Sequence, residues 1–239
     1  QFPMGIFSVA LASAILPSLS GLVSKNDIGS IKKMIVFSLE NISFVMCPTI
    51  VILSLFSTPI IRILFQRGEF GAYSTGITAY ALSFYALGLF SFGGIKILVT
   101  AYYALQDTKT PVKVAAACLV INAVLNFILM VPLKVGGIAL ASSIAGTINF
   151  LILFYIINKR LGGLDSGLFA YFLKIALAGL LTAVFAFKVW GVAPFSSEFL
   201  NLIFVSVLCA FFYELVCLAL NVGQAHKILD WIKSVKREA

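Results

Sequence analysis

The chain has 239 residues, of which 61% are hydrophobic and only 11% are charged. Soluble domains carry about 25% charged residues, so this composition excludes a water-soluble globule. The net charge of +8 is spread over several loops, which favours contact with anionic lipid headgroups over nucleic-acid binding.

The apolar residues run in blocks near the length that a helix needs to cross the hydrocarbon core, about 20 residues. A membrane β-barrel would instead show alternating strands of about 10 residues. We therefore predict an all-α polytopic membrane protein with about seven transmembrane helices. In chain order the predicted spans are 2–22, 34–56, 73–104, 111–131, 136–157, 168–190 and 199–221.

Two spans depart from the simple pattern. The first follows directly on the start of the chain at Gln1, with neither an initiator methionine nor the n-region of a signal peptide, so we expect a chain truncated at its N-terminus. The span 73–104 is too long for one straight crossing, for which ~20 residues suffice. We expect it to tilt strongly or to break near Gly93 and Gly94.

Lysine and arginine are concentrated in alternate loops. One set of loops carries eleven of them, namely Lys25, Lys32, Lys33, Lys109, Lys113, Lys159, Arg160, Lys227, Lys233, Lys236 and Arg237. The other set carries four, namely Arg62, Arg67, Lys134 and Lys188. By the positive-inside rule the first set is cytoplasmic, which places the C-terminus inside.

The connections between spans suggest three parts. Spans one to five, within residues 1–160, are joined mostly by short connections. A glycine-rich connection then leads into 161–222, which holds a further helix pair. The tail 223–239 alternates apolar and basic residues at helical spacing and is predicted to be a cytoplasmic amphipathic helix at the membrane interface.

Charged residues inside the spans are candidates for a substrate cavity, because a central lysine costs roughly 2.5–3.5 kcal/mol to insert. Lys96 lies ten residues before Gln106, hence about 15 Å deep at 1.5 Å per residue. It could face a water-filled cavity and meet an anionic substrate group. Alternatively it pairs with a carboxylate such as Glu40, or snorkels. Glu40 could likewise face the cavity or reach the interface.

A second polar group involves two neighbouring spans. Asn122 and Asn126 are four residues apart and share one helix face, and Ser142 lies early in the next span. Two amide oxygens, a hydroxyl and a backbone carbonyl could hold an ion the size of Na⁺. The alternative is hydrogen bonding between helices, worth ~0.6 kcal/mol per bond.

The sequence has few residues in the patterns that enzymes use for catalysis. There is a single histidine, His226, and the carboxylates are scattered, mostly in loops. Neither a metal-binding histidine pair nor a phosphate-cradling glycine loop occurs. We predict a transporter rather than an enzyme, with no cofactor; Na⁺ or H⁺ coupling or the membrane potential remain as energy sources.

The connection 106–113 carries the most specific pattern in the chain. Asp107 and Thr108 can cap the helix that follows, and Pro111 suits its first turn because its missing N–H would be unpaired there anyway. The motif residues are Asp107, Thr108, Lys109, Thr110, Pro111 and Lys113. The loop resembles the cytoplasmic signature of the MurJ/MviN family of lipid II flippases. The stretches 2–20 and 64–70 are similar to the family's eighth span and following external loop.

This resemblance implies the C-terminal lobe of a MOP/MATE-like transporter over 1–160, lacking its first helix and the start of its second. It also implies two extra C-terminal helices, and 168–221 would border a groove for the lipid tail. The arginines that bind the pyrophosphate would lie outside this chain. A missing N-terminal lobe of the same protein is therefore an expected partner.

The implied function is transport of lipid II, undecaprenyl-diphosphate-linked disaccharide-pentapeptide, across the bacterial cytoplasmic membrane by alternating access. Lipid II and membrane lipids would be the other partners. Two alternatives stay open. One is another MOP-superfamily exporter, such as a polysaccharide-lipid flippase or a drug/cation antiporter. The other is a non-transporting membrane fragment.

Overall fold

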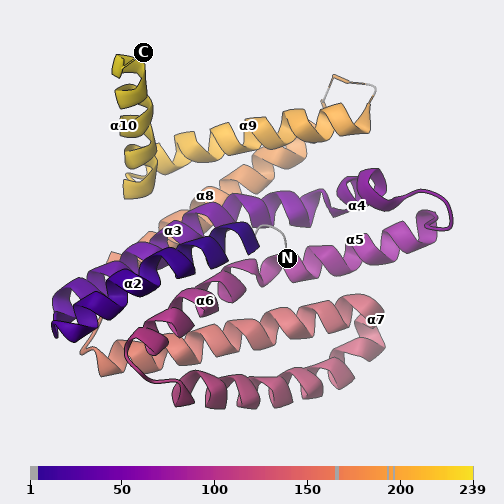
Figure 1. The fold of residues 1–239 in the computed structure, drawn as a ribbon. Coiled ribbons are helices and arrows are strands. Elements are labelled where there is room, and N and C mark those ends of the chain that lie inside the picture. The colour runs from indigo at the N-terminus through magenta and orange to yellow at the C-terminus, as the bar shows by residue number, and fades with distance from the viewer. Residues whose placement is uncertain (1–4, 165–166, 193, 196, 239) are drawn as a thin grey trace.

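The computed structural model describes residues 5–164, 167–192, 194–195 and 197–238, and each element in these ranges is a helix (Figure 1). The predicted all-α polytopic fold is therefore confirmed. In chain order the elements are η1 (Gly5–Val9), α2 (Ala10–Ser24), α3 (Ile28–Leu55), α4 (Ser57–Phe65), α5 (Ala72–Leu87), α6 (Leu89–Ala104), α7 (Lys109–Arg160), α8 (Gly167–Trp190), α9 (Glu198–Ala219) and α10 (Gly223–Glu238).

The number of membrane crossings follows from helix length. Among the described residues, five helices are long and apolar enough to cross a membrane, and the bent pair α5 and α6 makes a sixth crossing if counted as one span. Helix α7 has 52 residues and contains a non-helical residue at Lys134, so it is two helices joined at a sharp turn. Counting its two limbs separately gives the seven crossings that the sequence predicts.

Helix ends explain where the predicted spans were too short. Helix α3 begins at Ile28, before the expected start at residue 34, because the side chain of Asp27 accepts a hydrogen bond from the Ser30 N–H. After α3 the chain forms the short helix α4, which the apolar pattern did not predict. The predicted loop 57–72 is thus partly helical.

The long span over 73–104 breaks at Gly88, where α5 and α6 meet at 47°. The expected break near Gly93 and Gly94 is wrong, since both lie inside α6. At the bend the Gly88 N–H bonds to Tyr85 instead of Phe84. The freed Phe84 carbonyl accepts a hydrogen bond from the Ser143 hydroxyl at 2.8 Å. A Cβ on Gly88 would lie 2.7 Å from that hydroxyl, so glycine permits the contact.

Helix α6 lies at the centre of the main bundle, in contact with α2, α3 and α7. Close packing explains its two internal glycines. A Cβ on Gly94 would overlap the ring of Phe150 in α7, and one on Gly93 would lie 2.8 Å from the Ser8 hydroxyl. The ring of Phe92 occupies the space above Gly146 in the same way. Small residues thus let α6 approach both neighbours closely.

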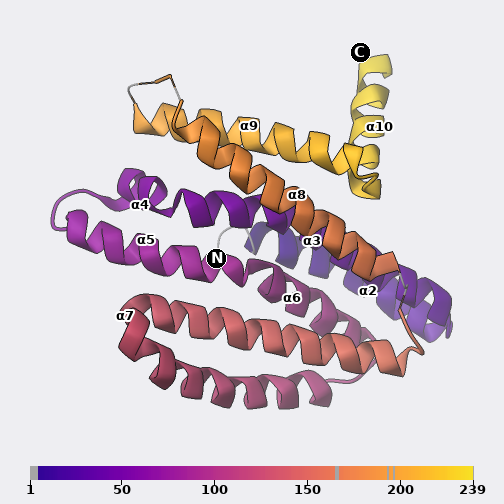
Figure 2. The same cartoon turned by 180° about the vertical axis from the view of Figure 1, so that it is seen from behind.

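Helices α8 and α9 pack on α3, on the side of the bundle away from α7 (Figure 2). One apolar cluster joins the three helices through Phe44, Tyr171 and Tyr213, and a second joins them through Val51, Ala186 and Val205. Helix α10 follows and contacts α3 as well as α9. The division at residues 160 and 222 stays a prediction.

The loops fall at two opposite ends of the bundle (Figure 1). One end holds the connections after α2, α6 and α7, which belong to the lysine-rich set of loops. Two contacts tie these connections together, since Arg160 pairs with Asp107 and Lys32 bonds to Gly162. The other end holds α4, the turn within α7 and the connection from α8 to α9.

Candidate functional site

The α7 hairpin builds the first candidate site. Lys134 has φ 50° and ψ −128°, which reverses the chain between the two limbs. The return is tight, because a Cβ on Gly137 would overlap the backbone carbonyl of Leu129. A Cβ on Gly136 would overlap the ring of Tyr80 in α5. Two adjacent glycines therefore let the limbs meet each other and the neighbouring helix.

This hairpin brings the three predicted polar residues together. The Asn122 amide nitrogen donates to Ser142 Oγ at 3.4 Å, and the Asn126 amide nitrogen donates to Asn122 Oδ1 at 3.0 Å. The Ser142 hydroxyl donates to the Ile138 carbonyl at 3.1 Å. The first limb thus supplies two amides, and the second supplies a hydroxyl and a backbone carbonyl.

One oxygen in this group lacks a partner. Asn126 Oδ1 is buried and accepts no hydrogen bond among the described residues. An unsatisfied buried acceptor costs roughly 1–3 kcal/mol, so natural proteins rarely keep one without a reason. The donor set is all oxygen and neutral, which suits a hard monovalent cation better than a transition metal. The group fits Na⁺, although hydrogen bonding between the limbs uses the same atoms.

Lys96 lies on α6 with an exposed side chain, and among the described residues it forms no ion pair. Thr100, one turn further along α6, bonds to its backbone carbonyl. Lys96 is therefore not the partner of Glu40. An exposed lysine in a membrane span needs water or another protein surface beside it, because lipid would leave its charge unsolvated.

Glu40 lies on α3 and bonds to residues of α8 and α10. Its Oε2 accepts a hydrogen bond from Gln224 Nε2 at 2.8 Å, and its carbonyl accepts one from the Tyr171 hydroxyl at 3.0 Å. It lines an open groove at the lysine-bearing end of the bundle. The alternative in which Glu40 pairs with Lys96 is therefore wrong, and a place for Glu40 in a substrate cavity stays a prediction.

Hydrogen bonds and an ion pair hold the motif loop, which connects α6 to α7. Asp107 Oδ1 accepts from the Thr110 N–H at 3.0 Å, and Oδ2 accepts from the Thr110 hydroxyl and from Arg160 Nη1, both at 2.8 Å. These Thr110 hydrogen bonds, with the Arg160 charge adding to them, hold the pKa of Asp107 below its ordinary value. Thr108 makes no side-chain capping bond, so only Asp107 caps the helix as predicted.

The remaining motif residues occupy the first turns of α7. Pro111 is buried there, whereas Lys109 and Lys113 are exposed. Gln106, two residues after the end of α6, adopts the left-handed conformation with φ 58°. Its N–H bonds to Tyr103 and the next N–H to Tyr102, which satisfies the last carbonyls of α6.

Sequence reasoning missed three partners. Arg160 binds Asp107 from 53 residues away, and Tyr171 and Gln224 hold Glu40 from 131 and 184 residues away. Only Arg160 had a signal in the sequence, because the charge pattern assigns it to the same set of loops as Asp107.

Sequence comparisons match most of this chain to known proteins. A sequence model of the family described as "Lipid II flippase MurJ" matches residues 1–211. The "Probable lipid II flippase MurJ" of Buchnera aphidicola subsp. Acyrthosiphon pisum (strain APS) is 32% identical over 211 residues, which cover 85% of this chain and 41% of that protein. The protein with the same description from Haemophilus influenzae is 30% identical, with coverages of 95% and 47%.

A solved structure agrees with the sequence matches. "Lipid II flippase MurJ, inward closed conformation" superposes with a TM-score of 0.73 at 29% identity, covering 89% of this chain and 43% of that one. The chain thus spans less than half the length of these relatives. Sequence and fold agree over nearly all of the residues here, and the chain belongs to the lipid II flippase MurJ family.

Proposed function

We propose that this chain supplies the C-terminal lobe, residues 1–160, and the additional helix pair, residues 161–222, of a flippase for lipid II. The observation that carries the proposal is the family match over residues 1–211 together with the matching solved structure. In the full protein this lobe rocks against an N-terminal lobe, and the diphosphate-sugar head crosses between them. The lipid tail stays in the bilayer beside 168–221.

The orientation of the lobe follows from its charges. The loops after α2, α6 and α7 lie at one end of the bundle, and together with the C-terminal tail they carry eleven of the fifteen lysines and arginines counted above. This end faces the cytoplasm in the bacterial inner membrane, because positive loops are retained there. The C-terminal helix α10 then lies on the cytoplasmic surface.

The deciding experiment is complementation. The full-length gene that contains this chain is expressed in bacteria depleted of their own lipid II flippase. Rescue of growth and cell shape is the expected result. Failure of rescue by protein that is well expressed and inserted in the membrane contradicts the assignment and favours another exporter of the superfamily.

The α7 hairpin is proposed as the site of Na⁺ coupling. Its support is the convergence of Asn122, Asn126 and Ser142, with a buried oxygen of Asn126 that has no hydrogen-bond partner among the residues the structure describes. Sodium binding stabilises the folded protein by RT ln(1 + [Na⁺]/Kd), so NaCl should raise the melting temperature more than KCl at equal ionic strength. The double variant N122A/N126A should lose this difference.

The matched control for the sodium test is Asn41→Ala. Asn41 is also a half-buried asparagine in a membrane span, but its amide bonds to the Phe37 carbonyl of its own helix. This variant should keep the sodium response. Equal responses in wild type and N122A/N126A would show that the three polar residues only join the two limbs.

Lys96 is proposed to contribute positive charge to the transport cavity. Its support is an exposed side chain on a central helix without an ion pair among the described residues. Lys96→Ala in the intact protein should lower flipping, measured in proteoliposomes. Lys188→Ala, which removes an exposed lysine in the last turn of α8, serves as the control. Unchanged flipping in K96A would contradict the cavity role.

A further inference from the structure

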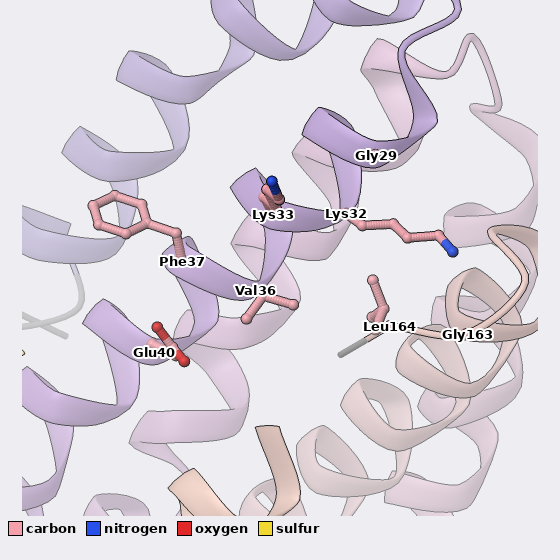
Figure 3. A pocket seen from close by; sticks show the side chains of 8 residues that line it. All are labelled: Gly29, Lys32, Lys33, Val36, Phe37, Glu40, Gly163 and Leu164. Atoms are coloured by element: carbon pink, nitrogen blue, oxygen red, sulfur yellow. The ribbon is translucent and has the colours of Figure 1, made fainter. Parts of the chain in front are cut away.

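An open groove lies at the lysine-bearing end of the bundle, between the first turns of α3 and the connection from α7 to α8 (Figure 3). Its volume is about 500 Å³, and its lining includes Lys32, Lys33, Phe37 and Glu40 on one side and Gly163 and Leu164 on the other. We propose that this lysine groove binds the headgroup of an anionic phosphoglycerol lipid from the surrounding bilayer. The proposal is independent of transport activity.

Lys32 and Lys33 give the groove its positive charge, and Lys33 also interacts electrostatically with Asp27, outside the lining. Lys33 is exposed and Lys32 is half-buried, and among the described residues neither forms an ion pair. Lys32 Nζ makes one long hydrogen bond, to the Gly162 carbonyl at 3.4 Å, so further N–H donors remain. Lys227 of α10 adds a third cation, 4.8 Å from the centre of the Phe37 ring. A phosphate offers the several acceptor oxygens that these ammonium groups need.

Glu40 adds a negatively charged hydrogen-bond acceptor to the groove, away from the two lysines. It lies seven residues after Lys33, about 10 Å further along α3 at 1.5 Å per residue. Gln224 already donates to its Oε2 at 2.8 Å, which fixes the carboxylate and leaves acceptor capacity. A phosphate placed at the lysines therefore leaves a glycerol headgroup's hydroxyls to donate to Glu40. An ammonium headgroup also satisfies Glu40, but it adds positive charge to a groove that already has an excess.

The surroundings select a lipid over a soluble phosphate compound. The groove lies where α3 and α8 emerge from the apolar part of the bundle. Phe37, which lines the groove, is 43% exposed. Its side chain offers an apolar surface to acyl chains directly beside the lysines. Basic pockets between transmembrane helices at the level of the headgroups are known places of anionic lipid binding.

The experiment uses the full-length protein that contains this chain, purified in detergent. Phosphatidylglycerol and phosphatidylethanolamine with identical acyl chains are titrated, and retained lipid is counted by native mass spectrometry. The wild type should prefer phosphatidylglycerol. The variant K32Q/K33Q should bind it about 30-fold more weakly, roughly fivefold for each ammonium group that contacts the lipid phosphate. The control K25Q/K159Q removes the same charge from two exposed lysines outside the groove and should bind as wild type does.

Four results would overturn the proposal. They are unchanged binding in K32Q/K33Q, an equal loss in K25Q/K159Q, a preference for phosphatidylethanolamine, and displacement of the lipid by soluble glycerol phosphate. The third would make Glu40 the dominant group, and the fourth would make the groove a site for free phosphates. If K32Q/K33Q fails to fold because Lys32 loses its bond to Gly162, K33Q alone carries the test, with an expected loss of about fivefold.

Discussion

The turn of the α7 hairpin gives the sharpest prediction about stability. A methyl group added at Gly137 would overlap the backbone carbonyl of Leu129, which cannot rotate away as a side chain does. Overpacking of this kind costs typically 1–3 kcal/mol, and backbone contact places Gly137→Ala at the upper end of that range. The gain in helix propensity from glycine to alanine is at most about 1 kcal/mol. The expected net loss is therefore about 2 kcal/mol.

The assay is thermal unfolding of the full-length protein in detergent. For a cooperatively unfolding unit of about 150–250 residues, the size of this chain, a loss of 1 kcal/mol lowers the melting temperature by roughly 2–4 °C. Gly137→Ala should therefore lower it by about 4–8 °C. Gly76→Ala is the matched control, because Gly76 lies in α5 with nothing within 4 Å of the added Cβ. It should leave the melting temperature unchanged or raise it slightly. If Gly137→Ala melts with the wild type, the limbs have room to separate and the hairpin is not held by this contact.

Three further predictions concern charged groups at the ends of the bundle. Asp107→Ala should destabilise the protein by about 1 kcal/mol, because α7 loses its cap and Arg160 its partner, whereas Thr108→Ala should have no effect in the same melting assay. The pKa of Asp107 is lowered in the folded state, so its contribution to the free energy of unfolding is complete above about pH 4 and is lost as the pH falls through the folded-state pKa. Asp107→Asn should remove this pH dependence from melting curves recorded between about pH 3 and 6. The Arg62–Glu198 pair, 2.8 Å long but largely exposed, should show a coupling below about 1 kcal/mol in a double-mutant cycle, and high salt should reduce it; a coupling that salt leaves unchanged would contradict this reasoning.

The fold was predictable because a bilayer imposes one length on every crossing. Apolar runs of about 20 residues are visible in the sequence, and each became a helix or a helix limb. The meeting of Asn122 with Ser142 was predictable for a related reason. A short connection forces two successive spans to be antiparallel neighbours, so polar residues near it must lie close together.

The position of the bend was not predictable, because the sequence offers several glycines and does not rank them. Gly93 and Gly94 serve close packing against Ser8 and Phe150, while Gly88 takes the bend. The deciding contact is the Ser143 hydroxyl, 59 residues away from the carbonyl that it satisfies. The surroundings of Glu40 were hidden in the same way, since its partners come from helices far along the chain.

The contact between Ser143 and Phe84 has a consequence for motion. Straightening the span would return the Phe84 carbonyl to the Gly88 N–H, its ordinary partner in a continuous helix. The Ser143 hydroxyl would then be free to bond the carbonyl one turn back in its own helix, as serines in helices do. Both arrangements leave every one of these groups paired, so the bent and straight forms exchange hydrogen bonds instead of losing them. In hydrocarbon no water can replace a lost hydrogen-bond partner, so this exchange lets the span bend and straighten at Gly88 without leaving a polar group unpaired.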